Sequence, residues 1–240
     1  MKTLLNKIFS KILALFFPNH CLICNKLTSN KYFCKDCKEP EPIKVKLCPN
    51  CGSPLKHCSC KFYFYYFDKV VTCFEKADES EAAFYNFKFG ENLLGASYFG
   101  EIMAEKVSKA FKGAKIDYVT SVPMHPHQKH ARGYNQSELL ARKIAKINHL
   151  KYKSLLIKPK ATPIQHKTSS IAERFDNVRN TYKIKNDRLV RNKTILLVDD
   201  IMTTGATISE CARQLKLSGC ERVYAVAALK TFKKLKTDKF

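Results

Sequence analysis

The chain has 240 residues, a length at which one main domain with a small additional module is expected. Its 45% apolar and 27% charged residues, with eight glycines and nine prolines, exclude a collagenous, low-complexity or wholly disordered protein. The 43 basic and 21 acidic side chains leave a net charge of +22, and 17 basic against 4 acidic residues fall within residues 121–193. This excess fits a nucleic-acid-binding surface and fits solvated faces equally well, so charge alone decides nothing.

Residues 1–18 are predicted to form an amphipathic N-terminal helix that ends near Pro18. Its apolar residues recur at helical spacing: Leu5, Ile8, Phe9, Ile12, Leu13 and Phe16. The apolar run is too short to cross a membrane and no cleavage site follows it, so neither a transmembrane span nor a secretion signal is predicted. We expect this helix to pack on the neighbouring domain. The alternative is a helix that lies on a membrane surface, with its lysines on anionic lipid.

Residues 19–61 are predicted to form a zinc-binding module with double knuckles. Three cysteine pairs have the Cys-x2-Cys spacing and a fourth has Cys-x-Cys, and two pairs complete the four-sulfur shell that structural zinc prefers. The eight candidate ligands, sufficient for two zinc ions, are Cys21, Cys24, Cys34, Cys37, Cys48, Cys51, Cys58 and Cys60. Short loops favour pairing of the first four and of the last four. An interleaved pairing and a site in which His57 replaces one sulfur remain open.

Disulfides and an iron–sulfur cluster are the alternatives for these cysteines. The lack of a secretion signal indicates a reducing compartment, which favours zinc over disulfides. A closed four-sulfur shell leaves no position for a reacting water, so these sites are expected to be structural. Cys73, Cys211 and Cys220 stand apart and are expected to be small buried core residues.

Residues 62–240 are predicted to form an α/β domain. The aromatic stretch 62–67 is expected to be a strand between the two domains, with a base-stacking surface as the alternative. Residues 116–122 are predicted to form a strand that leads into a basic loop at 123–132. Residues 195–198 are a continuous apolar run, typical of a strand buried on both faces of a parallel sheet.

A polar loop follows this last strand and leads into a predicted helix and a further strand at 221–229. In such a βαβ unit a ligand lies beyond the carboxyl end of the first strand. The loop opens with Asp199 and Asp200, whose carboxylates suit the vicinal hydroxyls of a ribose, directly or beside Mg²⁺. It continues with hydroxyls, a glycine and a helix N-terminus that suit a monophosphate. These residues are Thr203, Thr204, Gly205, Ala206 and Thr207.

The run of apolar residues, two acids and Thr-Thr-Gly-x-Thr resembles the phosphoribosyl pyrophosphate signature of type I phosphoribosyltransferases. The resemblance implies a parallel sheet flanked by helices, with Asp199 and Asp200 on the ribose hydroxyls and residues 203–207 around the 5-phosphate. It also implies Mg²⁺ with the ligand and a pyrophosphate site on an earlier loop, for which Lys129 and Arg132 are the candidates. An Asp-Asp turn with a threonine N-cap explains only part of this pattern. No Walker lysine follows the glycine, which argues against a P-loop ATPase.

Further motifs resemble the ComF family of DNA-uptake competence proteins. They are Arg-Gly-Tyr-Asn-Gln-Ser-Glu at 132–138, Pro-Ile-Gln at 163–165 and Glu-Arg-Phe-Asp-Asn-Val at 173–178, together with the cysteine pairs and the phosphate loop. The resemblance covers about residues 17–230. It implies a cytoplasmic protein that binds incoming single-stranded DNA, with other DNA-uptake proteins at the inner membrane as partners. A peripheral position on the inner face of the membrane is the alternative location.

Two further sets of residues are predicted for this function. Cations that follow a DNA backbone and rings that stack on bases characterise single-strand binding, and the candidates are Tyr134, Arg142, Lys143, Lys146, Lys151 and Lys153. Residues 160–182 have few large apolar residues and are expected to be a mobile lid over the ribose site. Its candidate residues are Gln165, Arg174 and Asn177, and the choice between pyrophosphate and DNA phosphate as their ligand stays open.

Three functions follow, and no catalytic residue is assigned. The first is a competence factor that binds single-stranded DNA and phosphoribosyl pyrophosphate. The second is an active phosphoribosyltransferase of nucleotide salvage, although no nucleobase hood is identifiable unless residues 61–90 or the zinc module supply it. The third is a sensor in which phosphoribosyl pyrophosphate changes the affinity of a DNA or protein site.

Overall fold

The structure is a computed structural model that describes residues 19–58, 60, 64–90, 92–159 and 171–232. The predicted N-terminal helix at 1–18 lies outside these residues. Among the described helices, none combines the length and the apolar character needed to cross a lipid bilayer.

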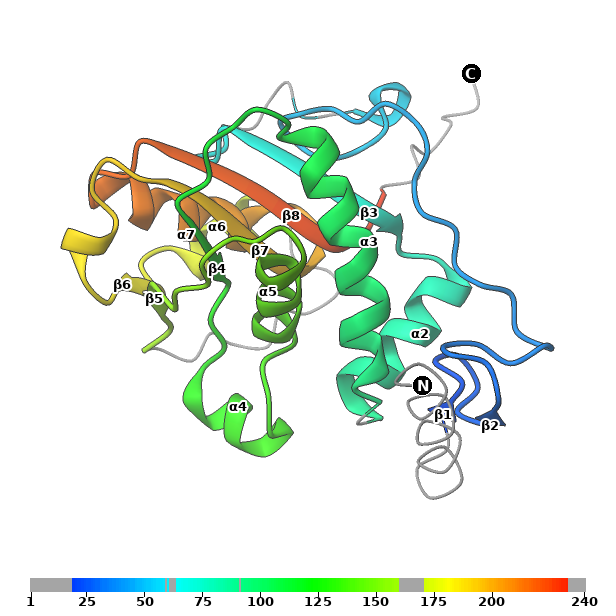
Figure 1. Ribbon diagram of the computed structural model, residues 1–240. Coiled ribbons are helices and arrows are strands. Elements are labelled where there is room, and N and C mark those ends of the chain that lie inside the picture. Colours follow the sequence, from blue (N-terminus) through cyan, green and yellow to red (C-terminus); the bar gives the residue numbers. More distant parts are fainter. Residues whose placement is uncertain (1–18, 59, 61–63, 91, 160–170, 233–240) are drawn as a thin grey trace, which may run out of the picture.

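A parallel sheet forms the centre of the molecule (Figure 1). Its four strands lie in the order β3 (Lys69–Glu75), β8 (Arg222–Lys230), β7 (Thr194–Met202) and β4 (Tyr118–Ser121). All three pairings are parallel, so the carboxyl ends of the strands meet at one edge. The predicted α/β fold with a parallel sheet is confirmed.

Helices cover both faces of this sheet (Figure 1). On one face lie α2 (Asp78–Phe89), α3 (Leu94–Ala110) and α5 (Gln136–Ile147), and on the other α6 (Ile171–Val178) and α7 (Ala206–Leu217). The short helix α4 (Pro126–Arg132) follows β4 and projects from the body. A small antiparallel sheet of β5 (Leu156–Ile157) and β6 (Lys183–Ile184) and a 3-10 turn, η3 (Asp187–Leu189), precede β7.

Strand β7 explains why the fold has two cores. Its side chains alternate between the faces: Leu196 and Val198 join the core under α3 and α5, while Ile195 and Leu197 join the core under α7. Burial on both faces is what a continuous apolar run favours in a parallel sheet. Cys73, Cys211 and Cys220 are buried in these cores, as predicted.

The cysteine module lies along the edge of the domain. Its first part contains the two-residue strands β1 (Asn19–His20) and β2 (Leu27–Thr28), and its second part contains the turn η1 (Leu55–His57). The chain between them runs beside β3: the Ile43 N–H donates to the Cys73 carbonyl and the Val70 N–H donates to the Pro49 carbonyl, each over 2.8 Å. The module therefore covers polar backbone groups of an edge strand.

Two expectations about local structure were wrong. Residues 64–67 are irregular rather than a strand, although the alternation persists, with Phe67 buried and Phe64 exposed. The predicted loop at 123–132 contains α4. The His125 side chain accepts from the His127 N–H, Pro126 occupies the first helical position, and Gly133 ends the helix at a φ of +82°.

Candidate functional site: the carboxyl end of the sheet

The phosphate loop runs from the end of β7 into α7. Gly205 adopts a φ of +86°, and a Cβ atom there would lie 2.6 Å from Met202 Cε and 3.1 Å from Tyr65 Cε1, so only glycine fits. The loop turns the first N–H groups of the 12-residue helix α7 toward a crevice lined by Asp199 and residues 201–208. Backbone N–H groups and the positive end of the helix favour an anion at this place.

The two acids lie together at the end of β7, and their pKa values are shifted in opposite directions. Burial and the charge of Asp200 hold the pKa of Asp199 well above its usual range. Burial also acts to raise the pKa of Asp200, but the Lys88 ammonium, 2.9 Å from its Oδ2, holds this pKa below its usual range. Asp199 Oδ1 accepts from the Ser137 hydroxyl over 3.3 Å and from the Asp200 N–H over 2.9 Å.

Lys88 is a site residue that the sequence did not reveal. It lies on the last turn of α2, and its carbonyl accepts from Gln136 Nε2 over 3.2 Å. Gln136 in turn accepts from Arg132 Nη1 over 2.9 Å. These contacts join α2 to the Arg-Gly-Tyr-Asn-Gln motif beside the two acids.

The two predicted pyrophosphate residues, both on α4, line different cavities. Arg132 lines a cavity with Lys88, and its guanidinium lies 4.8 Å from the centre of the Phe89 ring. Lys129 lines another cavity and forms a 3.1 Å ion pair with Glu138. The structure thus brings Arg132, but not Lys129, into the cavity that Lys88 lines.

The described part of the predicted lid already contacts the phosphate loop. Arg174 Nη1 donates to Thr203 Oγ1 over 3.3 Å, and Asn177 is exposed on the same helix, α6. Gln165 lies outside the described residues. That the segment acts as a lid stays a prediction.

Two side chains from distant segments donate hydrogen bonds to carbonyl oxygens of the phosphate loop. The Tyr65 hydroxyl donates to the Thr204 carbonyl over 3.1 Å, and Lys230 Nζ donates to the Thr203 carbonyl over 2.6 Å. Tyr65 belongs to the aromatic stretch that follows the last cysteine, so the loop is fixed partly by the end of the cysteine module.

The eight predicted metal ligands form two clusters that follow the sequential pairing. One holds Cys21, Cys24, Cys34 and Cys37, the other Cys48, Cys51, Cys58 and Cys60, with the sulfurs of each cluster within 4.8 Å of one another. The sulfurs of Cys24 and Cys34 are 3.7 Å apart, and those of Cys48 and Cys60 are 3.6 Å apart. A tetrahedron with Zn–S bonds of about 2.3 Å separates its sulfurs by about 3.8 Å, so the clusters fit zinc.

The first cluster is also set up for a thiolate. Burial acts to raise the pKa of Cys21, but hydrogen bonds from the backbone N–H groups of Cys24, Cys34 and Ile23 lower it to about 6. Asn86 of α2 donates to the carbonyls of Leu22 and Ile23 over 3.0 and 2.8 Å, which attaches this cluster to the helix that carries Lys88.

The predicted DNA residues differ in how accessible they are. Lys146, Lys151 and Lys153 are exposed. Arg142 and Lys143 form ion pairs, with Glu138 over 2.9 Å and with Glu101 over 3.3 Å. Tyr134 is half-buried, and its ring stacks on Phe87. Four of the six residues are therefore exposed, Arg142 included, while Lys143 and Tyr134 are half-buried.

Two domain families match the chain. Residues 95–239 match the phosphoribosyl transferase domain, and residues 12–63 match the double zinc ribbon domain. The first match spans more than half of the chain, which therefore belongs to the phosphoribosyl transferase domain family. The second match and the cluster geometry support structural zinc.

Several curated proteins are similar in sequence over most of the chain. DNA utilization protein YhgH of Escherichia coli O157:H7 is 27% identical over 217 residues, covering 86% of this chain and 94% of the relative. Competence protein F of Haemophilus influenzae is 24% identical over 225 residues, covering 87% of this chain and 95% of the relative. Competence protein ComFC of Streptococcus pneumoniae is 29% identical over 237 residues, covering 93% of each. Together with the two domains, these relatives confirm the predicted membership of the ComF family.

Solved structures of phosphoribosyltransferases are also similar. A crystal structure of adenine phosphoribosyltransferase is 13% identical and matches with a TM-score of 0.41, covering 59% of this chain and 73% of that one.

Proposed function

We propose that the chain binds phosphoribosyl pyrophosphate with Mg²⁺ at the carboxyl end of β7. The observation that carries this proposal is the placement of two carboxylates, Asp199 and Asp200, beside a glycine-turned loop at the N-terminus of α7. The 5-phosphate would lie on residues 203–207, where N–H groups and hydroxyls favour it, and the acids would accept hydrogen bonds from the ribose hydroxyls.

The ion pair between Lys88 and Asp200 is compatible with this ligand. Each carboxylate oxygen has lone pairs for two hydrogen bonds, so Asp200 still has acceptor capacity after pairing with Lys88 and with the Ile201 N–H. The cation also offsets one of two neighbouring negative charges, which lowers the repulsion of an incoming polyanion. Lys88 would thus keep Asp200 ionised without filling its binding capacity.

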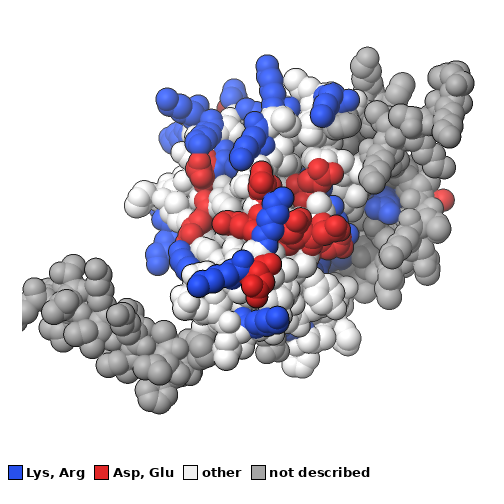
Figure 2. Space-filling view, turned by 90° about the vertical axis from the view of Figure 1, so that its right-hand side faces the viewer, with Lys and Arg blue, Asp and Glu red and all other residues white. Residues whose placement is uncertain are grey.

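We infer further that the protein acts in DNA uptake, as a cytoplasmic competence factor that binds single-stranded DNA. The relatives that the chain matches over 93–95% of their length are named competence and DNA utilization proteins. The exposed Lys146, Lys151 and Lys153 supply cations for a DNA backbone. Acidic side chains gather in the middle of the face shown in Figure 2, so DNA is not expected to cross that face. Other DNA-uptake proteins would be its partners.

Calorimetric titration tests the ligand. Phosphoribosyl pyrophosphate with Mg²⁺ is titrated into the protein, with ribose 5-phosphate and pyrophosphate as separate ligands. The proposal expects the complete ligand to bind more tightly than either part, because the loop and the acids each hold one portion of it. Pyrophosphate that binds as tightly as the complete ligand would contradict it.

Transfer of the ribosyl group to a nucleobase is the second candidate function, and the complete phosphate loop favours it. A scan of nucleobases for pyrophosphate release decides this point. Release with one base would make the protein a phosphoribosyltransferase, with the positioning of both substrates as its main contribution.

A further inference from the structure

A cavity of about 330 Å³ lies between the end of α2 and α4, next to the acid pair. Its lining consists of Lys88, Phe89, Gln128, Ala131, Arg132 and Tyr134. Two of these side chains are cationic and two are aromatic, and none of them is acidic. Lys88 connects this cavity to the sugar-phosphate site, because its ammonium pairs with Asp200.

An exposed pair of aromatic rings stands at the edge of this cavity. Tyr85 and Phe89 are one turn apart on α2, with ring centroids 4.9 Å apart, and they are 61% and 53% exposed. Together the two rings form a contiguous exposed apolar surface that is available for a contact. Arg132 lies over the Phe89 ring at 4.8 Å, so a cation accompanies the apolar surface.

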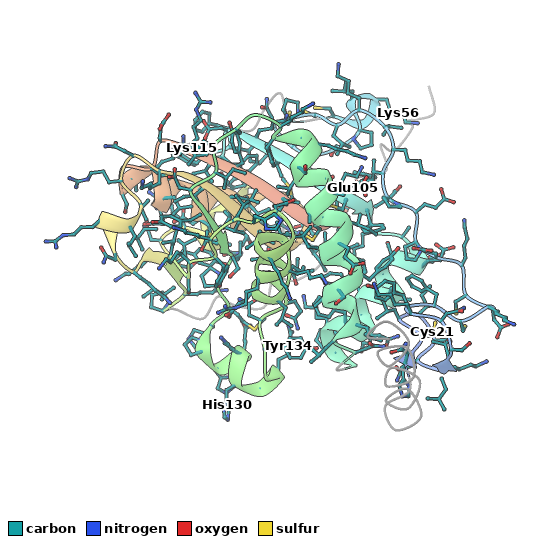
Figure 3. The ribbon with its side chains drawn as sticks, in the orientation of Figure 1. Cys21, Lys56, Glu105, Lys115, His130 and Tyr134 are labelled. Carbon is teal, nitrogen blue, oxygen red and sulfur yellow. The ribbon has the colours of Figure 1, made fainter. Side chains whose placement is uncertain are left out.

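Tyr134 forms the wall of the cavity rather than a free stacking surface. Its hydroxyl donates to the Phe87 carbonyl, and its ring stacks on Phe87 with centroids 6.3 Å apart. Figure 3 shows Tyr134 between α4 and the helices α2 and α3. If bases stack at this end of the molecule, the rings that receive them are therefore Tyr85 and Phe89.

We propose that Tyr85, Phe89, Lys88 and Arg132 form a base-stacking site for single-stranded DNA. The inference rests on the DNA-binding part of the proposed function and names the surface for it. Bases of a single strand have open faces that stack on aromatic rings and on guanidinium planes, while phosphates pair with the cations. Paired bases in a duplex offer no such faces, so the site favours a single strand.

The charges around Tyr85 and Phe89 indicate the path of the DNA strand across the surface. The first turn of α2, one to two turns before Tyr85, is acidic, with Asp78, Glu79 and Glu81, so carboxylates border the site on that side. On the other side the last turn of α4 is basic, with Lys129, His130 and Arg132. In Figure 3, His130 points away from the body at the tip of α4. The strand runs from Tyr85 toward α4.

The absence of tryptophan from the sequence gives a site-specific test. Phe89→Trp introduces a single tryptophan at the proposed site, whose emission can be excited selectively, and Leu217→Trp introduces one at a remote position that is 70% exposed. A short oligothymidylate is expected to quench the fluorescence of Phe89→Trp and to leave Leu217→Trp unchanged. Thymidine monophosphate at the same nucleotide concentration is expected to quench neither.

Affinity measurements complete the test. Phe89→Ala and Tyr85→Ala are each expected to weaken binding of the oligonucleotide about tenfold, while the affinity for phosphoribosyl pyrophosphate stays unchanged. If the wild-type protein and both variants bind the oligonucleotide with the same affinity, this site alone is overturned. Wild-type protein that binds no single strand would overturn the site and the DNA-binding function together. Quenching of Phe89→Trp by the mononucleotide to the same extent would identify a pocket for free nucleotides instead.

Discussion

The Tyr65 hydroxyl donates a hydrogen bond to the carbonyl oxygen of Thr204 over 3.1 Å, across 139 residues of sequence. Tyr65 stacks on Phe67 with ring centroids 5.0 Å apart, and its ring lies 6.1 Å from that of Phe175 on α6. One side chain thus contacts the phosphate loop, the exit of the cysteine module and the described part of the predicted lid.

Replacing Tyr65 with Phe removes this hydrogen bond and keeps the ring. We expect phosphoribosyl pyrophosphate to bind about fivefold more weakly, equivalent to about 1 kcal/mol, because the loop loses one of its supports. Calorimetry of Tyr65→Phe measures the change. The matched control is Tyr66→Phe, because Tyr66 contacts Ser209 through its backbone N–H and not its hydroxyl. Equal affinity in both variants would show that Tyr65 does not position the loop.

Metal content tests the two cysteine clusters. Because each cluster supplies four sulfurs, the wild-type protein should contain two zinc ions per chain, and Cys24→Ser and Cys51→Ser should each contain about one. Elemental analysis of the purified proteins gives these values. Wild-type protein with one zinc ion per chain would assign half of the cysteines another role.

The exposed lysines in the last turn of α5 and in the segment after it should control the salt dependence of DNA binding. The triple variant Lys146→Glu, Lys151→Glu, Lys153→Glu should bind DNA more weakly. The magnitude of its slope of log K against log salt should be smaller by about 2, since each phosphate contact on a single strand contributes about 0.7. The triple variant Lys109→Glu, Lys112→Glu, Lys115→Glu changes the charge by the same amount elsewhere on the protein and serves as the control. An equal loss in both triple variants would indicate a response to net charge rather than a defined path.

Asp199 should oppose folding at neutral pH. Its pKa is raised by burial and by Asp200, so its contribution to stability is present below the ordinary Asp pKa of about 3.9 and is lost as the pH rises through the folded-state pKa. Asp199→Asn should therefore raise the free energy of unfolding at pH 7 by about 1 kcal/mol. The gain should grow with pH.

Denaturant unfolding of ligand-free protein between about pH 5.5 and 8.5 measures this gain. Asp176→Asn, at an exposed position of α6, is the control and should change nothing. A loss of stability in Asp199→Asn throughout this range would mean that the carboxylate is favourably placed in the folded protein.

Local patterns in the sequence were sufficient for the phosphate loop and the cysteine clusters. The apolar run before Asp199, the threonines and Gly205 are consecutive, so their order alone defines a strand, a turn and a helix start. The cysteine pairs likewise lie close in sequence, and the favoured sequential pairing is the one in the structure.

Contacts between distant segments were not predictable in this way. Lys88 and Asp200 are 112 residues apart, and nothing in the residues around Lys88 indicates that α2 ends beside the acid pair. The alternating aromatics predict a strand that includes Tyr65, whereas contacts with the phosphate loop determine the actual position of this residue. The three-dimensional packing of α2 and of the cysteine module supplies what the sequence pattern lacks.

Binding of the sugar phosphate to the double variant Asp199→Asn, Asp200→Asn tests the account most directly. With Mg²⁺ present, calorimetry should show binding of phosphoribosyl pyrophosphate to the wild-type protein and a loss of affinity of at least about tenfold in the variant, because hydrogen bonds to charged groups contribute about 1.5–3 kcal/mol each. Undiminished affinity in a variant that folds and retains its zinc would contradict the assignment of these two acids to the ribose.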